Sequence, residues 1–129
     1  MQENYEKFAK VSANYVPLSP ISFLSRAEAL HSDRAAVIYG GLRRSWAETA
    51  KRIRKVAAGL TAAGIGKGDT ITVLCPNIPE LFELHFALPM TGAVINTLNT
   101  RLEPETIAYI LDHADTKTVI VDRGSWIVN

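Results

Sequence analysis

The densest group of side chains capable of chemistry follows a predicted strand that ends near position 98. Its members are amides, hydroxyls and a guanidinium: Asn96, Thr97, Asn99, Thr100 and Arg101. α/β proteins often place ligands just after a parallel strand, so the position suits a polar binding site. Asn and Thr side chains also close loops by bonding to the nearby backbone. We interpret the cluster as loop hydrogen bonding, with a ligand site as the alternative.

A glycine-rich run at 64–68, Gly-Ile-Gly-Lys-Gly, has the composition of a phosphate-binding loop, in which backbone amides approach an anion closely. Its context argues against that function. A phosphate loop follows a strand and opens a helix, whereas this run follows a predicted helix and opens a predicted strand. Gly68 also stands where a P-loop needs Ser or Thr. We therefore predict a plain helix-to-strand turn.

The histidines and the single cysteine form no catalytic or metal-binding pattern. His31, His85 and His113 are scattered, and no pair has the i, i+4 spacing of a helical metal site. Cys75 has no motif that supplies a base, and a lone cysteine is commonly a small buried hydrophobe. We expect surface or packed histidines and a structural cysteine. No catalytic, cofactor-binding or metal-binding residue is predicted in this chain.

Basic residues concentrate around the second predicted helix. The run contains Arg43, Arg44, Lys51, Arg52, Arg54 and Lys55. Cations beside Trp46 suit contact with RNA or with a nucleotide, because an indole ring stacks on a base. We favour a solvated helix face with Trp46 in the core. The 14 Lys and Arg nearly balance the 13 Asp and Glu, and the net charge of +1 predicts neither a nucleic-acid partner nor an anionic membrane surface.

Length and composition indicate one globular domain. The 129 residues lie within the usual size of a domain, and the apolar fraction is sufficient for a core. The lone Cys75 makes no internal disulfide, and the first ten residues lack the apolar region of a secretory signal, so we expect a reducing, cytoplasmic location. No apolar stretch approaches the roughly 20 residues that cross a bilayer. We expect a soluble chain.

Helix and strand signals alternate along the sequence. Expected helices cover 21–31, 46–63, 78–90 and 104–114, and expected strands cover 35–39, 42–45, 70–75, 93–98 and 118–122. Gly40 and Gly41 form a two-residue hairpin loop. Helix starts are predicted from Ser19 or Ser22, from a capping box of Ser45 and Glu48, and from Asn77.

The order of these elements predicts an α/β fold. Strand–helix–strand units imply parallel pairing with right-handed crossovers, so the strands near Ile71, Val94 and Val119 should form one sheet with helices on its faces. The hairpin should lie beside that sheet. One apolar stripe on the second helix contains Trp46, Ala50, Ile53, Ala57 and Leu60.

Several segments resemble, in the correct order, the start of the ATP-dependent acid–CoA ligases, also called acyl-activating enzymes. They are ANYVPLSPI at 13–21, the hairpin and capped helix at 37–63, GKGDTITVLCPNIPELFEL at 66–84, and the region 88–122, which begins LPMTGAVINTLNTRLEPETIAYIL. The first of these is most similar to the branch that acts on short or medium-chain fatty acids and benzoate-like acids. The resemblance implies an incomplete, N-terminal portion of the adenylate-forming large domain.

The family's reaction, as the resemblance implies it, activates a carboxylic acid with ATP and Mg²⁺ and passes the acyl group to coenzyme A. The family's phosphate loop, adenine segment, ribose-binding Asp and catalytic Lys all lie beyond Asn129, so no residue here takes a catalytic or binding role. We expect a chain that is inactive alone. The alternatives are a non-catalytic fragment that pairs with a full-length ligase and a small, unrelated nucleotide-binding α/β protein.

Three regions follow from this interpretation: an extended arm at 1–20, a partial AMP-binding domain at 21–122, and a tail at 123–129 that departs from the family pattern. An isolated partial domain leaves apolar surface and unpaired strand edges exposed. We therefore expect marginal stability or self-association of the chain on its own.

Overall fold

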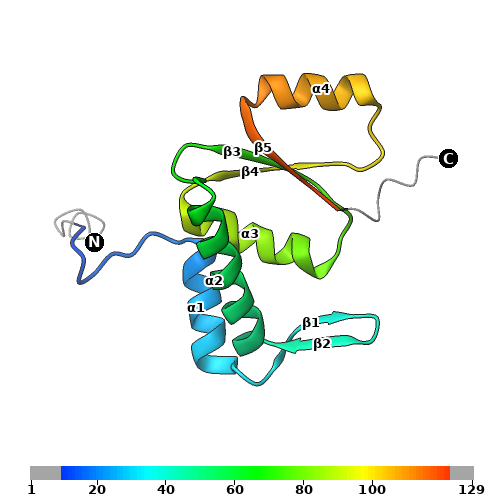
Figure 1. Ribbon diagram of the computed structural model, residues 1–129. Helices are drawn as coiled ribbons and strands as arrows, with labels where there is room; N and C mark the ends of the chain where they lie inside the picture. Colours follow the sequence, from blue (N-terminus) through cyan, green and yellow to red (C-terminus); the bar gives the residue numbers. More distant parts are fainter. Residues whose placement is uncertain (1–9, 123–129) are drawn as a thin grey trace, which may run out of the picture.

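A computed structural model describes residues 10–122 of the chain and confirms the predicted α/β fold (Figure 1). The elements are α1 (Pro20–His31), β1 (Ala35–Tyr39), β2 (Leu42–Ser45), α2 (Trp46–Ala62), β3 (Thr70–Leu74), α3 (Pro79–Thr91), β4 (Val94–Leu98), α4 (Pro104–His113) and β5 (Thr116–Val121). Residues 10–19 contain a turn but no helix or strand. The remainder of the expected arm and the whole tail at 123–129 lie outside the described residues.

The three later strands form the predicted parallel sheet, in the order β4-β3-β5. Thr70 pairs with Val94 at one end of β3, and Leu74 pairs with Leu98 at the other. The helices α3 and α4 supply the two crossovers. All four residues from Ile71 to Leu74 are buried, as expected for a central strand that is covered on both faces.

The strands β1 and β2 form a separate antiparallel hairpin, which does not join the parallel sheet. Tyr39 pairs with Leu42 across the two-residue loop. Gly40 has φ +54°, the positive value that the first central residue of a type II′ hairpin turn requires. The expectation that the hairpin lies beside the parallel sheet is wrong: Figure 1 shows it at the end of α2 where that helix begins, away from the sheet.

Two connected hydrophobic clusters hold one side of the sheet to the helices. In the first, Ile71 and Val73 of β3 pack with Leu84 and Leu88 of α3. In the second, α1, α2 and α3 meet through Leu24, Ala50, Ile53, Ala57 and Ala87. The side chains of Ile53, Ile71 and Leu88 are fully buried. These contacts confirm most of the apolar stripe predicted on α2, although Trp46 and Leu60 at its ends are only half-buried.

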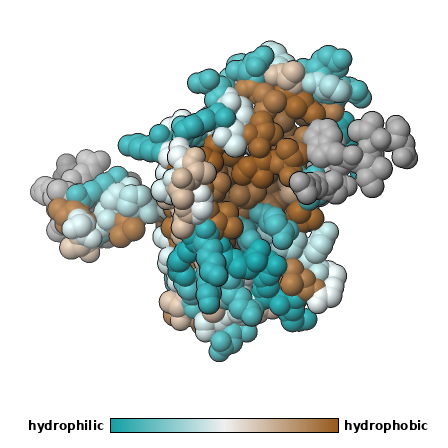
Figure 2. Space-filling view, in the orientation of Figure 1, coloured by the Kyte–Doolittle hydropathy of each residue, from teal (hydrophilic) through white to brown (hydrophobic). Residues whose placement is uncertain are grey.

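The opposite face of the sheet carries much less cover. Side chains alternate along a strand, so the register places Val94, Val119 and Val121 on the same face as Thr72. These three valines are 55%, 43% and 43% exposed, and α4, the only helix drawn on that side in Figure 1, has no buried residue. Figure 2 shows a broad hydrophobic area across the sheet between α4 and α3. Helices therefore flank the sheet unevenly.

Local capping signals predicted the helix starts with one exception. Ser19 caps α1 in a capping box with Ser22, and Ser45 caps α2 with Glu48. The prediction for α3 is wrong, because Ile78 rather than Asn77 occupies the N-cap and makes no side-chain cap. Pro79 takes the first helical turn, where its fixed φ suits a helix and its missing N–H costs nothing.

The first helix buries few of its large apolar side chains. Leu24 is 1% exposed, whereas Phe23 and Leu30 are 56% and 64% exposed. Within residues 10–122, no helix is both long and apolar enough to cross a bilayer.

Replacement of Gly92 by alanine should destabilise the fold by about 1–2 kcal/mol, the usual cost of a left-handed conformation for a residue with a Cβ. Gly92 ends α3 with φ +82°, and an added Cβ would lie 3.1 Å from the backbone of Lys67. The matched control is Gly59→Ala in α2, where an added Cβ has no neighbouring atom within 4 Å. This substitution should stabilise the helix by about 0.5–1 kcal/mol, because alanine favours a helix more than glycine does. Urea unfolding of both variants measures these changes in stability. Midpoints that shift in the same direction for the two variants would contradict the prediction.

Candidate functional site

The polar cluster at positions 96–101 divides between the sheet and the following loop. Asn96 lies within β4, where its side-chain amide donates to the Thr72 hydroxyl at 3.1 Å, and that hydroxyl also lies 2.8 Å from the hydroxyl of Thr116. In the loop, the Asn99 side chain accepts from the Arg101 amide at 3.0 Å. The structure therefore uses Asn96 and Asn99 in internal hydrogen bonds.

The glycine run at 64–68 is the predicted turn between α2 and β3. Its Gly66 amide donates to the Asp69 carboxylate at 2.7 Å, and Lys117 of β5 donates to the same Oδ2 at 2.8 Å. Lys117 also donates to the Gly64 carbonyl at 2.9 Å. The Asp69 carboxylate thus occupies the Gly66 amide that a bound anion would need. The glycine run is therefore a structural connection between α2 and β3.

Two hydrogen bonds lower the pKa of the Asp69 carboxyl. The larger effect comes from Lys117 and the smaller one from the Gly66 amide. A lowered pKa means that the contribution of this carboxylate to stability is present above the ordinary carboxyl pKa and is lost as the pH falls through the lowered value. We predict that Lys117→Gln raises the pKa of Asp69 toward its ordinary range. An NMR titration of the carboxyl measures this; Lys51→Gln on the exposed face of α2 is the control and should leave it unchanged.

The predicted solvated basic face is wrong for two of its arginines, because they enclose a buried carboxylate. Arg44 Nη1 donates to Glu83 Oε1 at 2.8 Å, and Arg52 donates through Nε to Oε1 at 2.6 Å and through Nη2 to Oε2 at 3.1 Å. The Glu83 side chain is 2% exposed. We call these three residues the Glu83 cluster. The cluster joins β2, α2 and α3, and both guanidinium groups bind an internal carboxylate.

Other residues of the basic run also have local contacts. Arg54 pairs with Glu28 of α1, and this contact lowers the pKa of the Glu28 carboxyl, chiefly through hydrogen bonding to the guanidinium. Trp46 packs half-buried against the second hydrophobic cluster, so its ring does not stand free to stack a base.

His85 and His113 each make a local contact. His85 bonds through Nδ1 to the Leu81 carbonyl at 2.8 Å, and His113 stacks on Tyr109 with 5.6 Å between ring centroids. Burial raises the pKa of the Cys75 thiol, which disfavours a reactive thiolate. Between residues 10 and 122, no three His, Cys, Asp or Glu side chains gather in a group that suits a metal ion.

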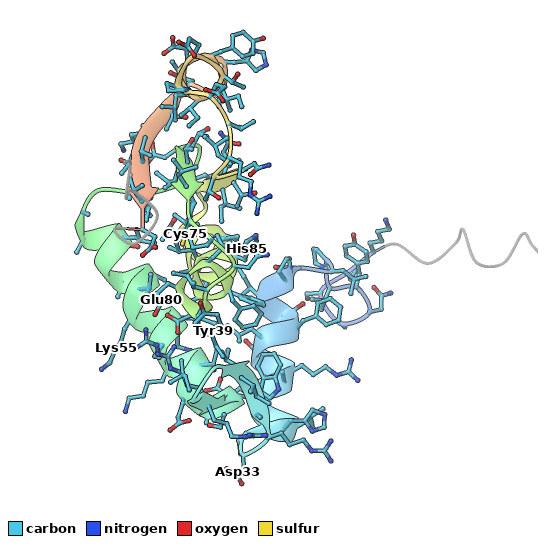
Figure 3. The ribbon with its side chains drawn as sticks, turned by 90° about the vertical axis from the view of Figure 1, so that its right-hand side faces the viewer. Asp33, Tyr39, Lys55, Cys75, Glu80 and His85 are labelled. Atoms are coloured by element: carbon cyan, nitrogen blue, oxygen red, sulfur yellow. The ribbon has the colours of Figure 1, made fainter. Side chains whose placement is uncertain are left out.

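An open groove of about 580 Å³ lies between β1 and the first half of α3. We call it the hairpin groove. Its β1 wall is the run of four consecutive residues 36–39, and its α3 side includes Phe82 and Phe86, whose ring centroids are 5.2 Å apart in an edge-to-face pair. Tyr39, Asn77 and His85 are its polar lining residues. Figure 3 shows Tyr39 and His85 on the same side of the molecule.

Sequence reasoning missed the hairpin groove because its two walls are about forty positions apart in the chain. A partial signal was present, since β1 reads AAVIY without a charge and α3 is apolar nearly all round. Among residues 10–122, those that line the groove include no Asp, Glu, Lys or Arg. It can bind an apolar group, but it offers no ligand set for a nucleotide phosphate or for Mg²⁺.

Comparison with known proteins gives a consistent match. The chain matches the family described as AMP-binding enzyme over residues 24–128. It is 47% identical over 117 residues to a peroxisomal trans-cinnamate:CoA ligase of Petunia hybrida and 47% identical over 110 residues to a peroxisomal butyrate–CoA ligase of Arabidopsis thaliana. These matches cover 91% and 85% of this chain but only 20% and 19% of the two relatives.

The structure also resembles part of a solved enzyme, the O-succinylbenzoate coenzyme A synthetase of Bacillus subtilis in complex with ATP and magnesium ion. The TM-score is 0.75 at 25% sequence identity, and the match covers 79% of this chain and 28% of that enzyme. The chain thus spans about a fifth of the length of the curated relatives that it matches. The described residues correspond to a portion of a larger fold.

Proposed function

Since the chain belongs to the AMP-binding enzyme family, we propose that it is the N-terminal portion of an acid–CoA ligase, whose activity requires the remainder of that enzyme. The observation that carries this proposal is the match over residues 24–128 together with the names of the relatives, which are acid–CoA ligases. The solved neighbour with bound ATP and magnesium supports ATP and Mg²⁺ as cofactors of the whole enzyme, and the ligases support coenzyme A.

In the proposed reaction, a carboxylate oxygen of the acid attacks the α-phosphorus of ATP and pyrophosphate leaves. The thiol of coenzyme A then attacks the acyl carbonyl, AMP leaves, and the thiol proton passes to a base or to solvent. A metal ion and cations neutralise the phosphate charge in the first step. The described residues provide no such cations at a common site, so we assign them a structural contribution: they build one end of the sheet that the rest of the enzyme completes.

The relatives also suggest a substrate class and a compartment. Because one is named for cinnamate and another for butyrate, we propose an aromatic or short aliphatic carboxylic acid as the substrate. Cysteine use favours a cytoplasmic location, whereas these relatives are named peroxisomal. Both compartments are proposals. Imaging of a fluorescent fusion of the complete gene product in its own cells would decide between them.

A second candidate is an interaction fragment that associates with itself or with a full-length ligase. The observation in its favour is the poorly covered face of the sheet, where Val94, Val119 and Val121 stay exposed. Size-exclusion chromatography of the purified chain tests this candidate. A monodisperse monomer that melts cooperatively at high temperature would contradict both self-association and the marginal stability that we expect.

The decisive experiment for the ligase proposal grafts the chain onto a relative. In a chimera, residues 1–122 replace the matching segment of the Petunia trans-cinnamate:CoA ligase. With ATP, Mg²⁺, cinnamate and coenzyme A, we expect the chimera to form cinnamoyl-CoA and the 129-residue chain alone to release no pyrophosphate. The Petunia ligase without its matching segment is the control. A folded but inactive chimera, or activity of the chain alone, would overturn the proposal.

A further inference from the structure

We propose that the outer face of α4 docks on the outer face of α2 in a second copy of this chain. The contact joins an acidic helix to a basic one, and each copy carries both faces. The inference goes beyond the proposed function, because it rests on the charges of this chain and not on a reaction. It also differs from association through the exposed valines, which burial of apolar surface would drive.

The first observation is that the charge of the chain is divided between two parts. Residues 20–62, which form α1, the hairpin and α2, contain eight Lys and Arg and three Asp and Glu. Residues 70–122, which form the sheet, α3 and α4, contain two Lys and Arg and seven Asp and Glu. The formal charges are +5 and −5, and they remain +3 and −4 when the Glu83 cluster is left out. The net charge of +1 conceals this separation.

The acidic face lies on the solvent side of α4. Glu105, Tyr109 and Asp112 follow one another at helical spacing, and all three are exposed. Tyr109 is 65% exposed and stacks on His113. Between positions 102 and 116 the chain contains no Lys or Arg. The outer face of α4 therefore presents an aromatic ring between two carboxylates without a cation beside them in the sequence.

The basic face lies on the side of α2 opposite its buried residues. Lys51 and Lys55 are exposed on consecutive turns, and the following turns expose only the small residues Ala58, Gly59 and Ala62 on this side. The two ammonium groups match the two carboxylates of α4 in charge and number. The small residues leave room for the Tyr109 ring, and tyrosine is a residue type that is enriched at the centres of protein interfaces.

The two faces do not meet within one copy. Figure 1 shows α4 above the parallel sheet and α2 below it, so the sheet separates them. A second copy can bring them together. Because the two faces are different surfaces, the contact is heterologous and can repeat from copy to copy. One helix face buries less area than a standard interface, so we expect weak, salt-dependent association that grows with concentration.

Sedimentation equilibrium of the 129-residue chain tests the force that drives association. From about 20 to about 300 mM NaCl the screening length falls from about 20 to about 6 Å, so the apparent dissociation constant should rise about tenfold or more. Sodium sulfate screens charges too, but it strengthens the burial of apolar surface. A chain that stays monomeric at low salt would overturn the inference. Association that strengthens in sulfate would assign the contact to the valines and would overturn it as well.

Two charge-reversal variants identify the faces. One carries Lys51→Glu with Lys55→Glu, and the other carries Glu105→Lys with Asp112→Lys. We expect each variant to be monomeric at low salt, because its two faces now have the same sign. A 1:1 mixture should associate again, since every face of one variant matches a face of the other.

The control for these variants is Lys51→Arg with Lys55→Arg, which keeps the charge and should associate like the unmodified chain. Circular dichroism checks that each variant is folded. Folded variants that associate singly as before, or a mixture that stays monomeric, would overturn the inference. If a reversed variant fails to fold, the comparison of NaCl with sulfate on the unmodified chain decides.

Discussion

The Glu83→Gln chain is expected to lose about 3 kcal/mol of unfolding free energy, since removal of one member of a buried ion cluster typically costs 3–5 kcal/mol. The carboxylate is 2% exposed and accepts hydrogen bonds from both Arg44 and Arg52. Without its charge, two guanidinium groups face each other with no counter-ion. The Arg44 side chain is only 17% exposed and has little access to water, whereas Arg52 is 43% exposed and is partly relieved by solvent, which places the expected cost at the lower end.

The control for this effect is Glu80→Gln, the same substitution one turn earlier on α3. Glu80 is exposed in the first turn of the helix, so its loss should cost about 0.5 kcal/mol. Urea unfolding followed by circular dichroism measures both. In a marginally stable partial domain, the Glu83 variant should be largely unfolded even without denaturant. Similar unfolding midpoints for the two variants would show that the Glu83 cluster adds little to stability.

Truncation of the Leu88 side chain should produce the other large loss of unfolding free energy. Leu88 is fully buried and packs with Ile71 and Val73, so it holds α3 against the central strand. Leu88→Ala removes apolar contact and leaves a cavity, for which about 3 kcal/mol is typical. Thermal unfolding by circular dichroism measures the effect. Leu30→Ala makes the same chemical change at a side chain 64% exposed and should cost less than about 0.5 kcal/mol. Equal melting temperatures would mean that the contact between helix and sheet is not formed in solution.

The features predicted correctly from the sequence are those whose signals are local. Ser45 and Glu48 stand three positions apart and cap α2 as expected, and Gly40 supplies the positive φ of the hairpin turn. The parallel sheet follows from the alternation of strands and helices, which general handedness rules convert into a topology. The misplaced cap of α3 shows the limit of local rules: Asn77 and Pro79 compete to set the first turn, and the proline sets it.

The features that the sequence did not reveal depend on distant partners. Glu83 lies 39 positions from Arg44 and 31 from Arg52, and only the fold brings them together. A run of cations on a helix gives no sign of which member meets a buried anion, so the sequence pattern predicts a solvated face for all of them. The hairpin groove has the same origin, because its walls come from β1 and α3 and neither element alone indicates a cavity.

The exposed valines of the parallel sheet bear on the order of events during synthesis. In the longer ligase that we propose, this portion leaves the ribosome first, at about 5–20 residues per second, so the rest of a protein some five times its length follows only after on the order of tens of seconds. Throughout that interval Val94, Val119 and Val121 offer an apolar surface to other nascent chains. Until later segments of that ligase cover it, this face is apolar surface of the kind that makes a partly synthesised chain prone to aggregation.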